Sequence, residues 1–378
     1  MEPLEWSNFP LPLIQVNPPK MSVTNGLISV AYKTGVFSNT AEIQRLASSE
    51  MAKHVGGDFH GYLASSNTSA LTACLIAVGV RGRHVLISNF TFAATLDAVV
   101  LAGGIPIICD ISPESLILDK EKIDSILQSK EFDVAAVMPT RVFGFASDIS
   151  DIVALCNSKK VPVIVDAAAS FPGKEDSWNF NLQALYEVFS LHATKVFGIG
   201  EGGLIIGSQE AIEKVKRTAN FGILLDGSLK FKDGLNSKAD EFTAARALAR
   251  LQEYSVDVEK RYSFVGLYKK IFSTCKTITL IGDNPETIYS YFPVIFESEE
   301  SLLKFQEVIS PFIMSRRYYF PTIQNGYIGD AKICYDKDLG ISDSVASRIL
   351  CLPVYISCTK EVETEISSLV KKALEKLN

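Results

Sequence analysis

Uninterrupted apolar runs alternate with amphipathic segments through the first two thirds of the chain. The apolar runs predict strands at residues 61–66, 84–88, 105–109, 132–139, 161–166, 185–191 and 202–208. The segments between them predict helices at residues 68–78, 92–102, 122–129 and 149–158. Because the strands are apolar on both faces, helices have to cover both sides of the sheet. The pattern therefore favours an α/β fold with a mostly parallel sheet.

The two ends of the chain have other patterns. Residues 1–35 are rich in proline and predict an irregular N-terminal arm. A helix is expected after Asn39 and Thr40. Further along, the expected elements are helices at 238–254, 255–272 and 299–309, a strand at 289–296 and a last helix from Thr359. We therefore divide the chain into the arm (1–35), a large domain (36–254) and a smaller C-terminal α+β domain (255–378).

Composition and charge exclude several classes of function. The chain has 378 residues and a net charge of −6, which argues against a nucleic-acid-binding surface. Its four histidines are scattered and no cysteine pair has ligand spacing, so no metal site is expected. Seven cysteines without a C-x-x-C pair are typical of a reduced, cytoplasmic protein. The longest apolar run, at 98–109, is too short and too interrupted to span a membrane, and no signal-peptide pattern precedes it.

Gly198, Gly200 and Gly203 satisfy the G-x-G-x-x-G pattern of dinucleotide-binding proteins. That pattern has this meaning only where it follows a strand and opens a helix. Here a strand-like segment follows the glycines instead. We interpret them as residues that let the chain turn sharply beside a ligand.

Polar and reactive residues follow three predicted strands at their carboxyl ends, where ligands bind in open α/β sheets. The amides of Thr68 and Ser69 open a helix, and either bind an anion or are capped by neighbouring side chains. Asp166 ends an apolar strand, and either caps the next turn or faces a cationic group. Lys195 follows Ser190 in a glycine-rich loop. A phosphate cradle, a buried acid and a lysine are together what pyridoxal 5′-phosphate (PLP) requires.

The motifs at these places resemble those of the DegT/DnrJ/EryC1/StrS family of sugar aminotransferases, in the aspartate aminotransferase superfamily (fold type I). The resemblance covers nearly the whole chain, and its motifs fall in order. They are SNTSAL (66–71), SNFTFAAT (88–95), VDAAA (165–169), SLHATK (190–195), GEGG (200–203), GLNSKADEFTAA (234–245) and the Leu-Pro pair in CLPVYISCTKE (351–361). The resemblance implies a PLP-dependent transaminase whose large domain has a mostly parallel sheet of the seven-stranded type.

The resemblance also implies roles for individual residues. Lys195 would bind the cofactor as a Schiff base and move the substrate proton, and Asp166 would pair with the ring nitrogen. Phe92 would stack on the ring, the alternative being a core position on its helix. The cofactor phosphate would be held by Thr68, Ser69 and Ser190, and by Asn236 of the neighbouring subunit. The contact from Asn236 implies a homodimer with shared active sites.

Three positions depart from the family pattern. Asn67 stands in place of a glycine, Ala169 in place of a Gln or His that touches the cofactor in many members, and Lys238 in place of an arginine. Asn67 accommodates the positive φ that a glycine would adopt. Lys195 itself argues against the dehydratase branch of the family, in which a histidine replaces the lysine.

The expected substrate comes from the stretch SRRYYFP (315–321). Arg316 and Tyr318 suit a diphosphate and a stacked base or sugar, or belong to a basic surface strand. His192 lies either near the substrate or in a packed position. The stretch resembles that of enzymes that aminate C4 of dTDP-4-keto-6-deoxyhexoses, with L-glutamate as donor, for O-antigen or natural-product sugars. The alternatives are amination at C3, a cyclitol ketone as substrate, or a non-catalytic regulator on the same fold.

Overall fold

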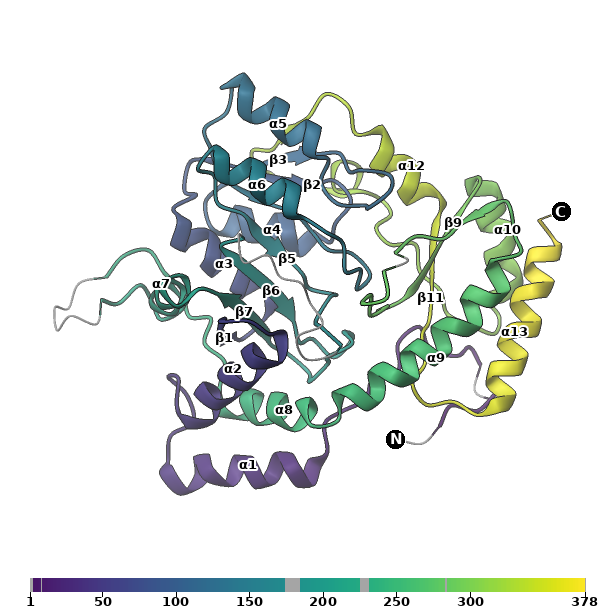
Figure 1. Cartoon of the computed structure of the whole chain (residues 1–378), viewed down its shortest axis with the longest axis horizontal. Helices are drawn as coiled ribbons and strands as arrows, with labels where there is room; N and C mark the ends of the chain where they lie inside the picture. The colour runs from purple at the N-terminus through teal and green to yellow at the C-terminus, as the bar shows by residue number, and fades with distance from the viewer. Residues whose placement is uncertain (1–2, 8, 174–183, 225–230, 283, 378) are drawn as a thin grey trace.

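The computed structural model describes residues 3–377 apart from 8, 174–183, 225–230 and 283. Helices lie on both sides of a central sheet, and a second group of elements stands beside it (Figure 1). The predicted α/β fold is confirmed. None of the helices in these ranges is long and apolar enough to cross a membrane.

The central sheet contains all seven predicted strands and one more. Four of them pair in the order β1 (His60–Ala64), β7 (Gly203–Gly207), β6 (Tyr186–Ser190) and β5 (Ile164–Asp166). The other four pair in the order β10 (Cys334–Tyr335), β3 (Ile105–Cys109), β2 (His84–Ser88) and β4 (Val134–Met138). Parallel bridges between residues 137 and 163 and between 140 and 166 join the two halves. Only β7 is antiparallel to its neighbours among these described strands, so the sheet is mostly parallel.

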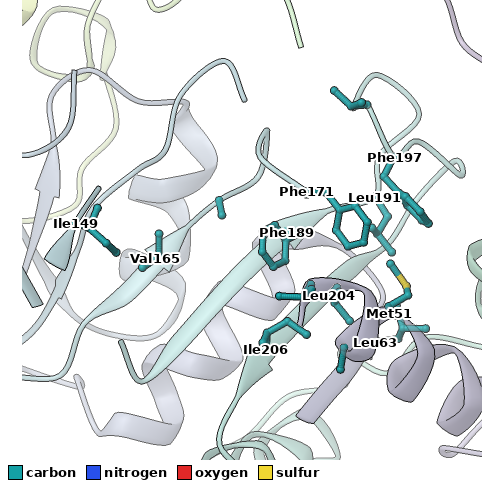
Figure 2. Packing of buried hydrophobic residues seen from close by; sticks show 14 of the residues in the cluster. Met51, Leu63, Ile149, Val165, Phe171, Phe189, Leu191, Phe197, Leu204 and Ile206 are labelled. Carbon is teal, nitrogen blue, oxygen red and sulfur yellow. The ribbon is translucent and has the colours of Figure 1, made fainter. Parts of the chain in front are cut away.

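Two cores lie on the two faces of this sheet, as the apolar strands require. One face is covered by α2 (Glu42–Val55), α5 (Lys120–Ser129), α6 (Ser150–Ser158) and α8 (Glu241–Leu251). The other is covered by α3 (Asn67–Val78), α4 (Ala93–Leu101) and α7 (Gln209–Ala219). Figure 2 shows part of the first core, in which Phe171 packs between Phe189 of β6 and Phe197.

The prediction that residues 1–35 are irregular is wrong for their second half. Residues 21–34 form α1 (Met21–Thr34), which ends at Gly35 in the left-handed conformation with φ of 71°. This helix lies beside α8 in Figure 1 and packs Leu27, Ile28 and Ala31 on the first core. Tertiary contact with α8, rather than a strong local pattern, therefore stabilises this helix.

The remaining elements surround a third core. α9 (Tyr254–Phe272) leads from α8 to an antiparallel sheet of β8 (Ile278–Thr279), β9 (Phe292–Phe296) and β11 (Ile349–Leu352). Around it lie α10 (Glu299–Ile309), α12 (Gly340–Arg348) and α13 (Lys360–Glu375). The short helix α11 (Ile323–Gly326) instead packs Ile323 on the core of α3, α4 and α7. The N-terminal segment joins this group through bridges from Leu4 to Cys358 and from Leu11 to Ile313. The boundary near residue 255 stays a prediction, because β10 returns from the C-terminal third to the central sheet.

Candidate active site

A cavity of about 370 Å³ opens at the carboxyl ends of β5 and β6. Eight of the ten residues singled out from the sequence line it, and they come from segments far apart in the chain. They are Thr68, Phe92, Asp166, Ser190, His192, Lys195, Arg316 and Tyr318. Ser69 and Asn236 do not line it. The fold thus brings together a lysine, a buried carboxylate, an aromatic face and two hydroxyls.

Asp166 is the last residue of β5, and its side chain is buried. Oδ2 accepts a hydrogen bond from Thr95 Oγ1 at 2.7 Å, and Oδ1 accepts longer ones from the Ala168 amide (3.2 Å) and Asn67 Nδ2 (3.4 Å). Burial raises the pKa of this carboxyl, although these donors and Lys195 act in the opposite direction. A cationic group in the cavity would oppose the effect of burial and favour the ionised form of Asp166.

Lys195 lies in a tight loop between β6 and β7. Its amide donates to the His192 carbonyl at 2.8 Å. A Cβ at Gly198 would lie 2.6 Å from the Ala193 carbonyl oxygen, so only glycine fits there. Burial lowers the pKa of the Lys195 amine, and Asp166 partly opposes this shift. A lowered pKa favours the neutral, nucleophilic amine that a carbonyl compound needs.

Arg250 of α8 holds the residue that follows this lysine. Its Nη2 donates to the Val196 carbonyl at 3.2 Å, and its Nη1 pairs with Asp257 of α9 at 2.5 Å. Both charged side chains are almost completely buried. Asp257 also accepts a hydrogen bond from Asn17 of the N-terminal segment at 2.5 Å. The lysine loop is thus tied to two helices and to the N-terminal segment, a contact that sequence reasoning missed.

Phe92 precedes α4 and is 55 % exposed. The alternative that it fills a core position is therefore wrong. An aromatic face at the wall of a cavity is available for stacking on a planar ring.

The predicted phosphate cradle is only partly present. Thr68 lies in the first turn of α3, where amides have no carbonyl acceptor within the helix, and Ser190 ends β6 at the same cavity. Ser69 has another role, because its amide donates to Ser66 Oγ while its hydroxyl accepts from the Ser66 amide. This capping box is the alternative that the sequence left open. The expectation that the Ser69 amide is available to an anion is therefore corrected.

Asn236 stands on the antiparallel bridge with Asn220 and accepts a hydrogen bond from Lys238 Nζ at 2.7 Å. It does not contact the cavity of its own chain. Its predicted contact with the cofactor of a neighbouring subunit stays a prediction.

His192 lines the cavity and is partly exposed. Its Nδ1 accepts from the Thr194 amide at 3.2 Å, so in the neutral ring the proton is on Nε2. Nε2 faces Glu201 Oε1 at 3.5 Å. The ring is therefore oriented at the cavity wall instead of being packed in the core.

Arg316 and Tyr318 form another part of the wall, together with Tyr291. The Arg316 guanidinium lies 4.7 Å from the centre of the Tyr318 ring, and the structure shows no carboxylate paired with it among the described residues. Arg317, by contrast, is paired with Glu299 at 2.6 Å. Arg316 is accordingly the arginine of this pair that is available to an anionic ligand in the cavity.

A second arginine of the cavity was missed from the sequence. Arg141 follows the end of β4, and its Nη1 lies 3.3 Å from Glu187 Oε1, with both side chains buried. A buried charge of this kind requires a partner of opposite sign. Arg141 and Glu187 are 46 residues apart, so no local sequence pattern indicates that they pair. Thr95 was missed for the same reason, because only folding places it beside Asp166.

The residues of the cavity fit pyridoxal phosphate. The Lys195 amine would hold the aldehyde, and the raised pKa of Asp166 would be relieved by a protonated ring nitrogen. Phe92 offers a face to the ring, and Thr68 and Ser190 offer hydroxyls to the phosphate. Ala169 also lines the cavity, and its methyl side chain offers no hydrogen bond to a ligand.

Comparison with known proteins is consistent with a site for pyridoxal phosphate. The model of the DegT/DnrJ/EryC1/StrS aminotransferase family matches residues 24–371. The dTDP-4-amino-4,6-dideoxy-D-glucose transaminase of Shigella dysenteriae is 27 % identical, over 96 % of this chain and 99 % of that protein. The 3-oxo-glucose-6-phosphate:glutamate aminotransferase of Bacillus subtilis is 26 % identical, over 80 % of this chain and 69 % of that protein. The crystal structure of DesI with its TDP-sugar product superposes with a TM-score of 0.85 at 20 % identity, over 97 % of this chain and 93 % of that chain.

Proposed function

The chain belongs to the DegT/DnrJ/EryC1/StrS aminotransferase family, and on that premise we propose that it transfers the amino group of L-glutamate to C4 of a nucleotide-linked 4-keto-6-deoxy sugar. The protein is a PLP-dependent sugar aminotransferase. The proposed acceptor is dTDP-4-keto-6-deoxyglucose, and the product would be the corresponding 4-amino sugar. The observation that carries the proposal is the convergence on one cavity of Lys195, Asp166 and Arg316, which has no carboxylate partner among the residues that the structure describes.

The chemistry divides between the cofactor and the residues around it. Bound PLP supplies the electron sink that allows a proton to leave the carbon bearing the amino group. Lys195 Nζ would hold the cofactor and would then accept or return that proton, and burial favours the neutral form of the amine by lowering its pKa. Asp166 would pair with the ring nitrogen and favour its protonated form. Phe92 would offer its face to the ring, and Thr68 and Ser190 would hold the phosphate.

The acceptor is inferred from the open wall of the cavity. Arg316 would bind the diphosphate, and Tyr318 and Tyr291 would contact the base or sugar. The relative from Shigella dysenteriae supports a dTDP sugar, and the relative from Bacillus subtilis supports glutamate as donor. We propose in addition that the protein works as a cytoplasmic homodimer with shared active sites and supplies amino sugars for O-antigen or natural-product synthesis.

The test is a panel of keto sugars with nitrogen-15-labelled glutamate. The panel contains dTDP- and UDP-linked 4-keto-6-deoxyglucose, a 3-keto isomer and a cyclitol ketone, with the labelled position read by NMR. We expect label at C4 of the dTDP sugar. Label only at C3, or only on the cyclitol, would contradict the proposed substrate, and absence of transfer to every ketone would contradict the enzyme function.

A pair of adjacent arginines provides a matched control. Arg316→Met is expected to raise KM for the nucleotide sugar about tenfold or more and to leave the half-reaction with glutamate unchanged. Arg317→Met removes the same charge outside the cavity and is expected to leave KM within about twofold. Equal effects of the two substitutions would contradict the assignment of Arg316 to the diphosphate.

A further inference from the structure

Three buried threonines form a continuous line of hydroxyls that ends at Asp166. Thr95 Oγ1 donates to Asp166 Oδ2 at 2.7 Å, Thr91 Oγ1 lies 2.7 Å from Thr95 Oγ1, and Thr140 Oγ1 lies 3.0 Å from Thr91 Oγ1. Thr95, Thr91 and Thr140 are 0 %, 3 % and 5 % exposed. Thr91 and Thr95 come from the segment before α4 and from α4 itself, whereas Thr140 follows β4.

The direction of the line follows from counting protons. A threonine hydroxyl has one proton to donate and two lone pairs that accept. Because Thr95 donates its proton to the carboxylate, it has to accept the proton of Thr91. Thr91 then has none left for Thr140 and accepts the proton of Thr140. All three O–H dipoles therefore point toward Asp166, in a buried region where hydrogen bonds strengthen one another.

We propose that Thr95, supported by Thr91 and Thr140, is a positioning residue that keeps Asp166 ionised and fixes it in the orientation that holds a positive charge on the cofactor ring nitrogen. Of the three hydrogen bonds that the described residues donate to this carboxylate, the one from Thr95 is the shortest by 0.5 Å. The other groups that face Asp166 are Asn67, the Ala168 amide, Lys195 and the phenol of Tyr319. Lys195 is committed to the cofactor, so Thr95 provides the strongest fixed contact.

The inference rests on the cofactor-binding part of the proposed function and not on the sugar. Its test therefore uses readouts that need no sugar. These are the nitrogen-15 chemical shift of the ring nitrogen in protein loaded with labelled PLP, the affinity for PLP, and the rate of the half-reaction with glutamate. A wrong sugar assignment would leave all three readouts unchanged. Failure of the sugar assignment can therefore be distinguished from failure of the role proposed for Thr95.

Thr95→Val keeps the shape of the side chain and removes the hydroxyl. We expect the ring nitrogen shift to move toward the unprotonated form and the half-reaction to slow by about ten- to a hundredfold, as for loss of a hydrogen bond to a charged group. Thr95→Ser keeps the hydroxyl and is expected to retain the parental shift. Thr91→Val is expected to shift both readouts in the same direction by a smaller amount.

Thr322→Val is the matched control, because Thr322 donates to Asp343 at 2.6 Å outside the cavity. It removes the same kind of hydrogen bond and is expected to leave the ring nitrogen shift unchanged. The proposal is overturned if Thr95→Val keeps the parental shift and rate, or if Thr95→Ser loses as much as Thr95→Val. If Thr95→Val does not fold, the ring nitrogen shifts and half-reaction rates of Thr95→Ser and Thr91→Val still test the proposal. If Thr91→Val keeps the parental chemical shift of the ring nitrogen, the proposed support of Thr95 by Thr91 and Thr140 is overturned.

Discussion

Replacement of Arg250 by methionine tests whether the lysine loop is held by a buried ion pair. The substitution keeps most of the aliphatic volume and removes the guanidinium that contacts Asp257 and the Val196 carbonyl. Asp257 would keep only the Asn17 amide as a described side-chain donor, and its buried carboxylate would lose its ion-pair partner, with the nearby Arg261 as a more distant cation. Because Val196 follows Lys195, the same change would loosen the segment that carries the reactive amine.

The expected magnitude follows from burial. Breaking a buried ion pair by removal of one partner costs about 3–5 kcal/mol, because the other charge stays in a poorly solvated place. The unpaired Val196 carbonyl acts in the same direction. With a urea m-value of about 3 kcal/mol per molar, the midpoint of unfolding is expected to fall by about 1–2 M.

The measurement is urea unfolding followed by far-UV circular dichroism. Arg83→Met is the control, since Arg83 pairs with Asp133 through two hydrogen bonds of 2.8 Å at the surface, and we expect its midpoint to stay at the parental value. Adding Asp257→Asn to Arg250→Met is expected to recover more than half of the loss, because the amide carries no charge. A fall of less than about 0.5 M for Arg250→Met, or no recovery in the double variant, would refute this reasoning.

Three further predictions concern the cavity. Asp166→Ala is expected to reduce kcat by about 10²–10³-fold, more than it reduces cofactor affinity, and near-parental turnover would show that this carboxylate only caps a turn. Burial raises the folded-state pKa of Asp166, so the cofactor-free protein loses stability as pH rises through that pKa. Asp166→Asn should therefore raise Tm at neutral pH but not at low pH. A lower Tm of this variant at neutral pH would contradict the direction of the pKa shift. Mixed dimers of Lys195→Ala and Asn236→Ala chains should be more active than the average of the parents, since one of their two sites is intact. Activity at that average after subunit exchange verified by mass spectrometry would show that Asn236 acts within its own chain or not at all.

Much of the fold was predictable because it depends on local patterns. The runs at 84–88 and 105–109 and the helix at 299–309 have the bounds that the apolar pattern predicted. Each of these segments is buried along one full face or on both, which is what produces a clear pattern. The helix α7 was missed although Ser208 caps it and Ile212 and Val215 form its buried stripe, so the sequence did contain its signal.

Other features depend on pairing between distant segments and have no local signal. β10 is two residues long and exists because Cys334 and Tyr335 pair with β3. In the site, Asp166 and Lys195 were predictable from strand ends. The hydrogen bond from Thr95 and the ion pair of Arg250 were not, because they depend on how α4 and α8 pack against the sheet.

The central claim is that Lys195 is the residue that binds the cofactor, and borohydride reduction of the PLP-loaded protein tests it most directly. Reduction fixes the bond between cofactor and lysine, and peptide mass mapping then locates the pyridoxyl group. We predict label on Lys195 alone and no label in the Lys195→Arg variant. Label on a different lysine, or a reduced holoprotein without any labelled peptide, would contradict the account.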